Sequence, residues 1–154
     1  MATLYSTQKT KWSQNVPSEK IDTNEQSGRL RIAFADVTLA GASIADVVQM
    51  VNLPNGARII DGYLTTAALG GSTTLSVGNA AYKNAAGTTV ALSAAAYFAA
   101  ASTVTATRND IFATQALGAN TVVDANEDGL PITITLAGGT ASGVVQVAIR
   151  YVVD

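Results

Sequence analysis

From Leu30 onward, apolar and polar residues alternate in short bursts, a spacing that is typical of β-strands. Residues 28–35 show it first, because three large apolar side chains fall on one side of the segment and two arginines on the other. The apolar residues are Leu30, Ile32 and Phe34, and the arginines are Arg29 and Arg31. The alternation predicts a half-buried strand whose apolar side faces the core.

Further strands are expected where β-branched residues recur between turn residues. These segments are residues 57–67, 73–78, 104–107, 121–124, 130–136 and 144–153. In the last of them, Val145, Val147 and Ile149 share one side, and Arg150 lies opposite. Residues 44–51 are ambiguous between a helical turn and a strand, and their three valines favour the strand.

Residues 93–102 (SAAAYFAAAS) form the one segment that predicts a helix. Ser93 is a favourable N-cap, the interior is rich in alanine, and Ser102 allows the helix to end. A helix this short is marginal by itself, so Tyr97 and Phe98 are expected to anchor it to a sheet.

Residues 1–28 differ from the rest because they are polar and poor in large aliphatic side chains. Such a segment buries too little apolar surface to offset its ordering entropy alone. We therefore expect an extended N-terminal arm at residues 1–28 and a β-sandwich body at residues 29–154. The many short strands and regular turns predict an all-β, antiparallel, jelly-roll-like sandwich with one short helix.

Composition adds an expectation about the surface. Of the 154 residues, 48% are hydrophobic but only 6% aromatic, so small and β-branched side chains are expected to fill the core. Charged residues make up 13%, about half the usual share. This deficit indicates that much of the surface is buried against other copies or another protein.

The net charge of −2 argues against a general nucleic-acid-binding protein. The first 31 residues nevertheless hold five of the nine cations against three carboxylates, so this segment is positive and suits an acidic surface. The absence of cysteine favours an intracellular or virion setting. The longest apolar run, residues 94–101, is too short to cross a bilayer, so no membrane partner is expected.

Catalytic chemistry is restricted by the residues that the chain lacks. Without His or Cys, it has no Ser-His-Asp or Cys-His catalysis, none of the usual zinc ligand sets and no thiol redox work. No glycine pattern matches a phosphate loop or a dinucleotide site. Four scattered carboxylates have no spacing that indicates paired catalysis: Asp36, Asp46, Asp61 and Asp110. We expect no enzyme, no catalytic residue and no cofactor.

Asp124, Asn126 and Asp128 match the first half of a calcium-binding loop, in which oxygen ligands recur at every second residue before a glycine. The twelfth position of that motif requires a bidentate Glu, and Thr135 stands there. An acidic β-turn without a metal is therefore the favoured interpretation. The same loop could instead receive the cationic arm of a neighbouring copy.

Five residues are candidates for binding a partner: Trp12, Lys9, Lys11, Arg29 and Arg31. Trp12 lies in the polar arm beside Lys11, and a lone tryptophan there is favoured as an anchor that fills a pocket on a partner. Arg29 and Arg31 either bind an acidic surface or form the solvent side of the first strand. Tyr82, Lys83 and Asn84 either belong to a sugar-binding rim or form an ordinary exposed loop, which is the favoured interpretation.

Several segments together resemble one family of small proteins encoded among the head genes of tailed bacteriophages, the capsid decoration, or cement, proteins. The segments are residues 1–8 (MATLYSTQ), 28–31 (GRLR), 53–63 (LPNGARIIDGY), 69–78 (LGGSTTLSVG) and 151–154 (YVVD). The resemblance spans nearly the whole chain and consists of turns, strand faces and the arm. It implies a jelly-roll-like domain on the outer face of the capsid.

The resemblance further implies a homotrimer whose arm threads onto neighbouring subunits, in the virion and, during assembly, in the host cytoplasm. The expected partner is the major capsid protein, and the expected role is to cement its adjacent subunits without catalysis. Direct binding of nucleic acid is not expected. The alternative is a carbohydrate- or receptor-binding module of a head fibre or tail, and a polysaccharide-cleaving enzyme is a third, less favoured interpretation.

Overall fold

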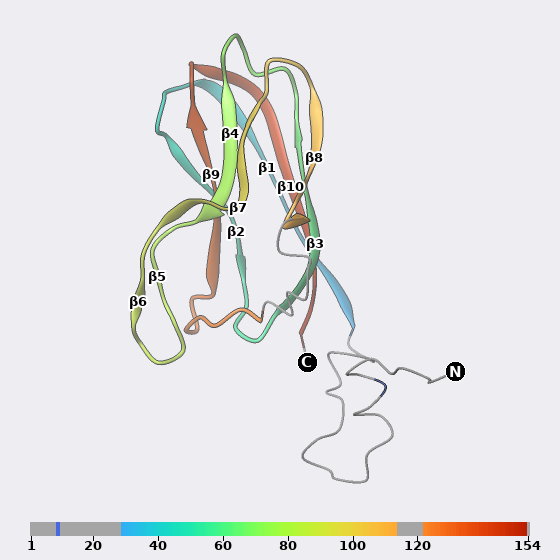
Figure 1. Ribbon diagram of the computed structural model, residues 1–154, viewed down its shortest axis with the longest axis vertical. Helices are drawn as coiled ribbons and strands as arrows, with labels where there is room; N and C mark the ends of the chain where they lie inside the picture. The colour runs from blue at the N-terminus through green and yellow to red at the C-terminus, as the bar shows by residue number, and fades with distance from the viewer. Residues whose placement is uncertain (1–8, 10–28, 114–121, 154) are drawn as a thin grey trace, which may run out of the picture.

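The computed structural model describes residue 9, residues 29–113 and residues 122–153 (Figure 1). The elements within residues 29–113 and 122–153 are all strands. They are β1 (Leu30–Ala42), β2 (Val47–Leu53), β3 (Arg58–Thr66), β4 (Thr74–Asn79), β5 (Tyr82–Lys83), β6 (Thr89–Val90), β7 (Ser93–Ser102), β8 (Thr107–Ile111), β9 (Leu130–Ala137) and β10 (Ala141–Val152). Nowhere in the described part is there a helix with the length and apolarity needed to cross a membrane.

The described strands form two antiparallel four-stranded sheets and one small hairpin. Sheet A has the order β1-β10-β3-β8, and sheet B has the order β2-β9-β4-β7. Neighbours in each sheet are mostly distant in sequence, as the long-range connections of a jelly roll require. The β5–β6 hairpin projects from the body beside sheet B (Figure 1). The predicted all-β, jelly-roll-like sandwich is thus confirmed.

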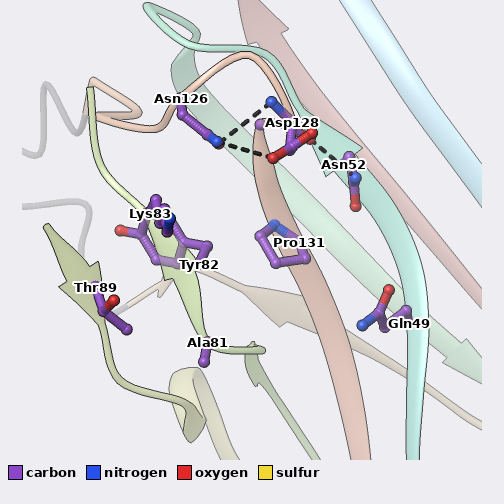
Figure 2. A pocket seen from close by; sticks show the side chains of 10 residues that line it. Gln49, Asn52, Ala81, Tyr82, Lys83, Thr89, Asn126, Asp128 and Pro131 are labelled. Atoms are coloured by element: carbon purple, nitrogen blue, oxygen red, sulfur yellow. Dashed lines mark hydrogen bonds between the residues drawn. The ribbon is translucent and has the colours of Figure 1, made fainter. Parts of the chain in front are cut away.

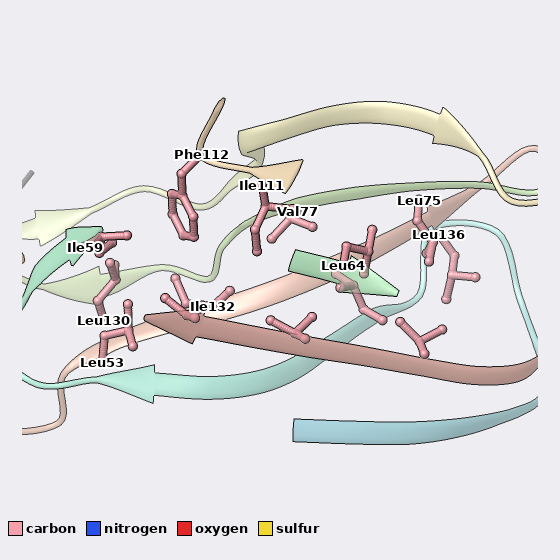
Figure 3. Packing of buried hydrophobic residues seen from close by; sticks show 14 of the residues in the cluster. Leu53, Ile59, Leu64, Leu75, Val77, Ile111, Phe112, Leu130, Ile132 and Leu136 are labelled. Atoms are coloured by element: carbon pink, nitrogen blue, oxygen red, sulfur yellow. The ribbon is translucent and has the colours of Figure 1, made fainter. Parts of the chain in front are cut away.

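The core lies between the sheets and consists mainly of leucine, isoleucine and valine (Figure 3). In β10, Val145, Val147 and Ile149 are fully buried, which confirms the predicted inward side of that strand. In β9, Ile132 and Ile134 are fully buried and face them from sheet B. Each such side chain stabilises the fold by roughly 1.5–3 kcal/mol relative to an exposed one.

The predicted helix at residues 93–102 is wrong, because this segment is strand β7. It pairs with β4, with Val77 opposite Phe98 and Thr74 opposite Ser102. A ten-residue helix is marginal in water even when rich in alanine. At the edge of sheet B the same backbone obtains partners along β4, while Tyr97 and Phe98 pack against the core. Long-range pairing therefore outweighs the local preference of alanine.

The other predicted elements agree with the structure to different degrees. Residues 44–51 contain a strand, β2, as their valines indicated. The strand predicted at residues 104–107 lies a few residues later, as β8. Residue 121 is outside the described ranges, and Val122 makes an isolated bridge to Arg58. Tyr82 and Lys83, for which an exposed loop is the favoured prediction, form β5, the first strand of the hairpin.

Candidate functional site

The outward side of β1 carries three large apolar side chains that the sequence pattern assigned to the core. Leu30, Ile32 and Phe34 are 57%, 63% and 58% exposed, so the prediction that they face the core is wrong. We call these three residues the β1 strip. Alternating apolar and polar residues show that the two sides of a strand differ, but they do not show which side is buried. Ala33 and Ala35 point inward instead, because they stand opposite the buried Ile149 and Val147 of β10.

A network of polar side chains lies beside the β1 strip on the same outward side of sheet A. Arg150 of β10 donates through Nε to Asp61 Oδ1 of β3 at 2.6 Å, and it pairs with the second carboxylate oxygen as well. Its Nη2 also donates to the hydroxyl of Tyr63 at 2.9 Å. Arg108 of β8 covers the Tyr63 ring, with its guanidinium carbon 4.1 Å from the ring centroid. The hydrogen bond with Asp61 raises the pKa of Arg150, so the guanidinium is firmly charged.

Strand register joins the strip to the network. Ile32 is paired with Arg150, which is paired with Asp61, and the row that starts at Phe34 continues through Ala148 to Tyr63. The surface thus combines exposed aliphatic and aromatic groups with Arg150, which is held by hydrogen bonds, and Arg108, which lies over the Tyr63 ring. This combination is enriched at protein–protein interfaces. We call it the sheet A surface.

Of the five residues predicted to bind a partner, three lie in the described ranges: Lys9, Arg29 and Arg31. Arg29 and Arg31 are exposed at the start of β1. Lys9 is described and exposed, whereas Trp12 and Lys11 lie outside the described residues. The roles of these five residues in binding stay predictions.

A second site lies on the opposite side of the sandwich, between sheet B and the β5–β6 hairpin. It is an open cleft of about 490 Å³. Figure 2 shows Tyr82 and Lys83 of the hairpin on one side, Gln49 and Asn52 of β2 on the other, and the acidic loop at one end. Pro131 of β9 forms part of the floor.

Two hydrogen bonds attach the hairpin to the loop at residues 124–129. The Asn126 N–H donates to the Lys83 carbonyl at 2.8 Å, and the Ala85 N–H donates to Asp124 Oδ1 at 3.0 Å. On the β2 side, Asn52 Nδ2 donates to the Asp128 carbonyl at 3.0 Å. The two walls of the cleft are therefore held relative to each other by the loop.

The three candidate calcium ligands all take part in hydrogen bonds. Asn126 Nδ2 donates to Asp128 Oδ2 at 2.8 Å, and the Asp128 N–H donates back to Asn126 Oδ1 at 3.2 Å. Asp124 instead holds the hairpin. Among the described residues, no group of three or more His, Cys, Asp or Glu side chains could hold a metal ion. A calcium site in this loop stays a prediction.

The four scattered carboxylates are spread over the body. Asp61 is paired with Arg150, and Asp46 Oδ2 accepts a hydrogen bond from the Ser43 N–H at 2.7 Å. Asp36 and Asp110 are exposed on strands of sheet A.

The sequence pattern does not link the residues of either surface. It predicts that Arg150 lies on the outward side of its strand, but the partners Asp61 and Tyr63 are nearly ninety residues earlier. Tyr82 and Lys83 had a sugar-binding interpretation among others, but nothing in the sequence linked them to Gln49 or Asn52. These contacts follow from strand pairing and not from spacing along the chain.

Comparison with known proteins finds solved structures that are similar to this chain. No family model matches the chain, and no curated protein matches it. A chain in the capsid asymmetric unit of cyanophage Pam1 has a TM-score of 0.60 at 21% identity, covering 82% of this chain and 86% of that chain. A chain in the capsid of Ralstonia phage GP4 gives the same values.

A chain in the acid-stable capsid structure of Helicobacter pylori bacteriophage KHP30 has a TM-score of 0.50 at 13% identity, covering 80% of this chain and 87% of that chain. At these identities the likeness concerns the fold. The chain therefore has the same type of β-sandwich as these chains from phage capsid structures.

Proposed function

We propose that this protein is a non-enzymatic structural component of a bacteriophage virion, which binds the outer face of the head and cements adjacent major capsid protein subunits. The sheet A surface is the observation that carries the proposal. The fold likeness to chains from three phage capsid structures supports the virion setting.

The β1 strip supports binding to a protein partner. Three neighbouring apolar side chains, each more than half exposed, leave apolar area in water that association removes. Arg150 stands opposite Ile32 of the strip and is ordered by Asp61 and Tyr63, and Arg108 on the far strand β8 is ordered by the Tyr63 ring. Less side-chain entropy is therefore lost when a partner covers them.

Cementing requires contacts with more than one capsid subunit. The arm at residues 1–28 precedes, in the chain, the strand β1 that carries the strip. In the proposal the strip binds one subunit, and the arm, with Trp12 as anchor, extends to the next. Association into a homotrimer multiplies these modest contacts through effective concentration.

The test is co-sedimentation of the protein with empty, expanded head shells of its own phage. We expect saturable binding of the wild-type protein at a fixed ratio per shell subunit. Ile32→Asp places a charge in the centre of the strip and should weaken binding by about 30-fold, as for an interface hot spot. Because Ile32 is 63% exposed, the variant should melt at the same temperature as the wild type.

Leu92→Asp is the matched control, since Leu92 is also more than half exposed but belongs to the segment between β6 and β7. It should bind shells like the wild type. A truncated chain without residues 1–28 should keep its body folded and bind poorly. Failure of the wild type to bind, or equal binding by Ile32→Asp, contradicts the proposal.

A further inference from the structure

The cleft on the sheet B side has the dimensions of a small-molecule site. Its volume of about 490 Å³ lies within the usual range of ligand pockets. It is open to the surface on the side of the sandwich opposite the sheet A surface, so a protein bound through sheet A would still expose it.

The polar groups along the cleft include both hydrogen-bond donors and acceptors. Within the described residues, the Gln49 amide, the Lys83 ammonium and the Thr89 hydroxyl have no hydrogen-bonding partner, so all three are free for a ligand. Asp128 adds a carboxylate, and its charge balances that of Lys83. The lining therefore suits a neutral ligand with several hydroxyl groups, because a hydroxyl both donates and accepts.

Apolar groups are also present in the cleft. The Tyr82 ring, the Pro131 ring and the Ala81 methyl line it together (Figure 2). A sugar ring has hydroxyl groups around its rim and C–H groups on its faces, so it needs polar partners beside it and an apolar surface against one face.

The walls are ordered before any ligand arrives. Asn126 and Asp128 bond to each other, Asn52 bonds to the loop, and the loop holds the hairpin through Lys83 and Asp124. Such preorganisation reduces the entropy lost on binding. An extended peptide would instead use a free strand edge or deep apolar pockets, whereas this cleft lies over the faces of β2 and β9.

We propose that the cleft between the β5–β6 hairpin and sheet B is a saccharide-binding site, with room for one or two pyranose rings. In this site Gln49, Lys83 and Asp128 bond to hydroxyl groups, and Tyr82 lies against the C–H face of a ring. The proposal does not depend on the shell-binding role, since it concerns the other side of the molecule.

The experiment is a titration of the isotope-labelled full chain, followed by amide NMR. The probes are glucose, galactose, N-acetylglucosamine and the disaccharides of these units, at concentrations up to about 20 mM because single sugars bind weakly. We expect at least one probe to shift the amides of Gln49, Tyr82 and Asp128 in a saturable way.

Gln49→Ala should weaken that binding by about 3- to 10-fold through loss of a hydrogen bond. Gln146→Ala is the matched control, since Gln146 lies on the outward side of β10, away from the cleft. It should bind the probe like the wild type, and both variants should melt at the wild-type temperature.

A panel in which no probe shifts the cleft amides overturns the proposal, as does a shift that Gln49→Ala leaves unchanged. A synthetic peptide of residues 1–28 serves as the competing probe. If the peptide alone shifts the cleft amides, the cleft receives the arm of a neighbouring copy, and the saccharide proposal fails.

Discussion

Thr73 and Thr133 are both fully buried, but their hydroxyl groups have different surroundings. The Thr73 hydroxyl donates to the Gly70 carbonyl at 2.9 Å and accepts a hydrogen bond from the Thr103 hydroxyl at 2.9 Å. The Thr133 hydroxyl has no partner among the described residues. Thr133 stands opposite Gln49 in the register of sheet B, on the side of β9 that bears Pro131. A buried hydroxyl without a hydrogen-bonding partner destabilises the fold, whereas a hydrogen-bonded one stabilises it.

Replacing each threonine by valine should therefore change stability in opposite directions. Thr133→Val removes an unbonded hydroxyl and should raise the free energy of unfolding by about 1 kcal/mol. Thr73→Val leaves the Thr103 hydroxyl without its acceptor and should lower the free energy of unfolding by about 1–3 kcal/mol. Urea unfolding of both variants measures the difference. Equal destabilisation by the two substitutions would show that Thr133 is bonded after all.

Tyr97 is a single residue that makes the stability of the fold depend on pH. Burial raises the pKa of its hydroxyl to about 12, and the nearby Tyr82 contributes to the rise. The ring packs against Phe112, with centroids 4.8 Å apart. The folded state therefore holds the proton more tightly than the unfolded state, in which the pKa is 10.0.

This difference predicts a loss of stability in alkali. The contribution of Tyr97 to the free energy of unfolding is fully present below pH 10. As the pH rises toward 12 this contribution is lost, and the free energy of unfolding falls by at most about 2–3 kcal/mol. Tyr97→Phe cannot ionise, so its unfolding free energy should fall less over this pH range than that of the wild type. Denaturant unfolding at pH 9 to 12 compares the two. Parallel pH profiles would exclude Tyr97 as the source.

At the scale of elements, Gly78 determines how closely β7 approaches β4. A Cβ atom at this position would lie 1.8 Å from the Ser93 carbonyl oxygen and 2.6 Å from the Ala94 carbonyl carbon. Both contacts are with backbone, which cannot rotate away. The absence of a side chain at Gly78 thus lets the first residues of β7 cross over β4.

Gly78→Ala should separate the two strands and lower the free energy of unfolding by about 3 kcal/mol or more. Gly71→Ala is the control, because a Cβ there meets nothing within 4 Å. It should change stability by less than about 1 kcal/mol. Thermal or urea unfolding measures both. If Gly78→Ala were as stable as Gly71→Ala, the contact between β4 and β7 would not be close.

At the scale of the whole molecule, the sandwich separates two surfaces of different character. The sheet A surface is apolar with ordered arginines and suits a protein partner, whereas the cleft is mainly polar and suits a small ligand. Because they lie on opposite sides of one core, both can be occupied together. Substitutions at Ile32 and at Gln49 therefore test the two proposals separately.

Much of the fold could be predicted from the sequence alone, because alternation with period two is a local property. The inward side of β10, the strand character of residues 44–51 and the all-β class each followed from residues next to one another in the chain. The polar arm and the lack of His and Cys likewise needed no structure.

Tertiary structure decided everything that depends on partners distant in sequence. Residues 93–102 became a strand because β4 offered hydrogen bonds that a short helix could not outweigh. The β1 strip faces outward because the buried Ile149 and Val147 of β10 stand opposite Ala33 and Ala35 of β1. Both surfaces assemble residues from separate strands, and such neighbours are set by sheet pairing, which alternation along one segment does not encode.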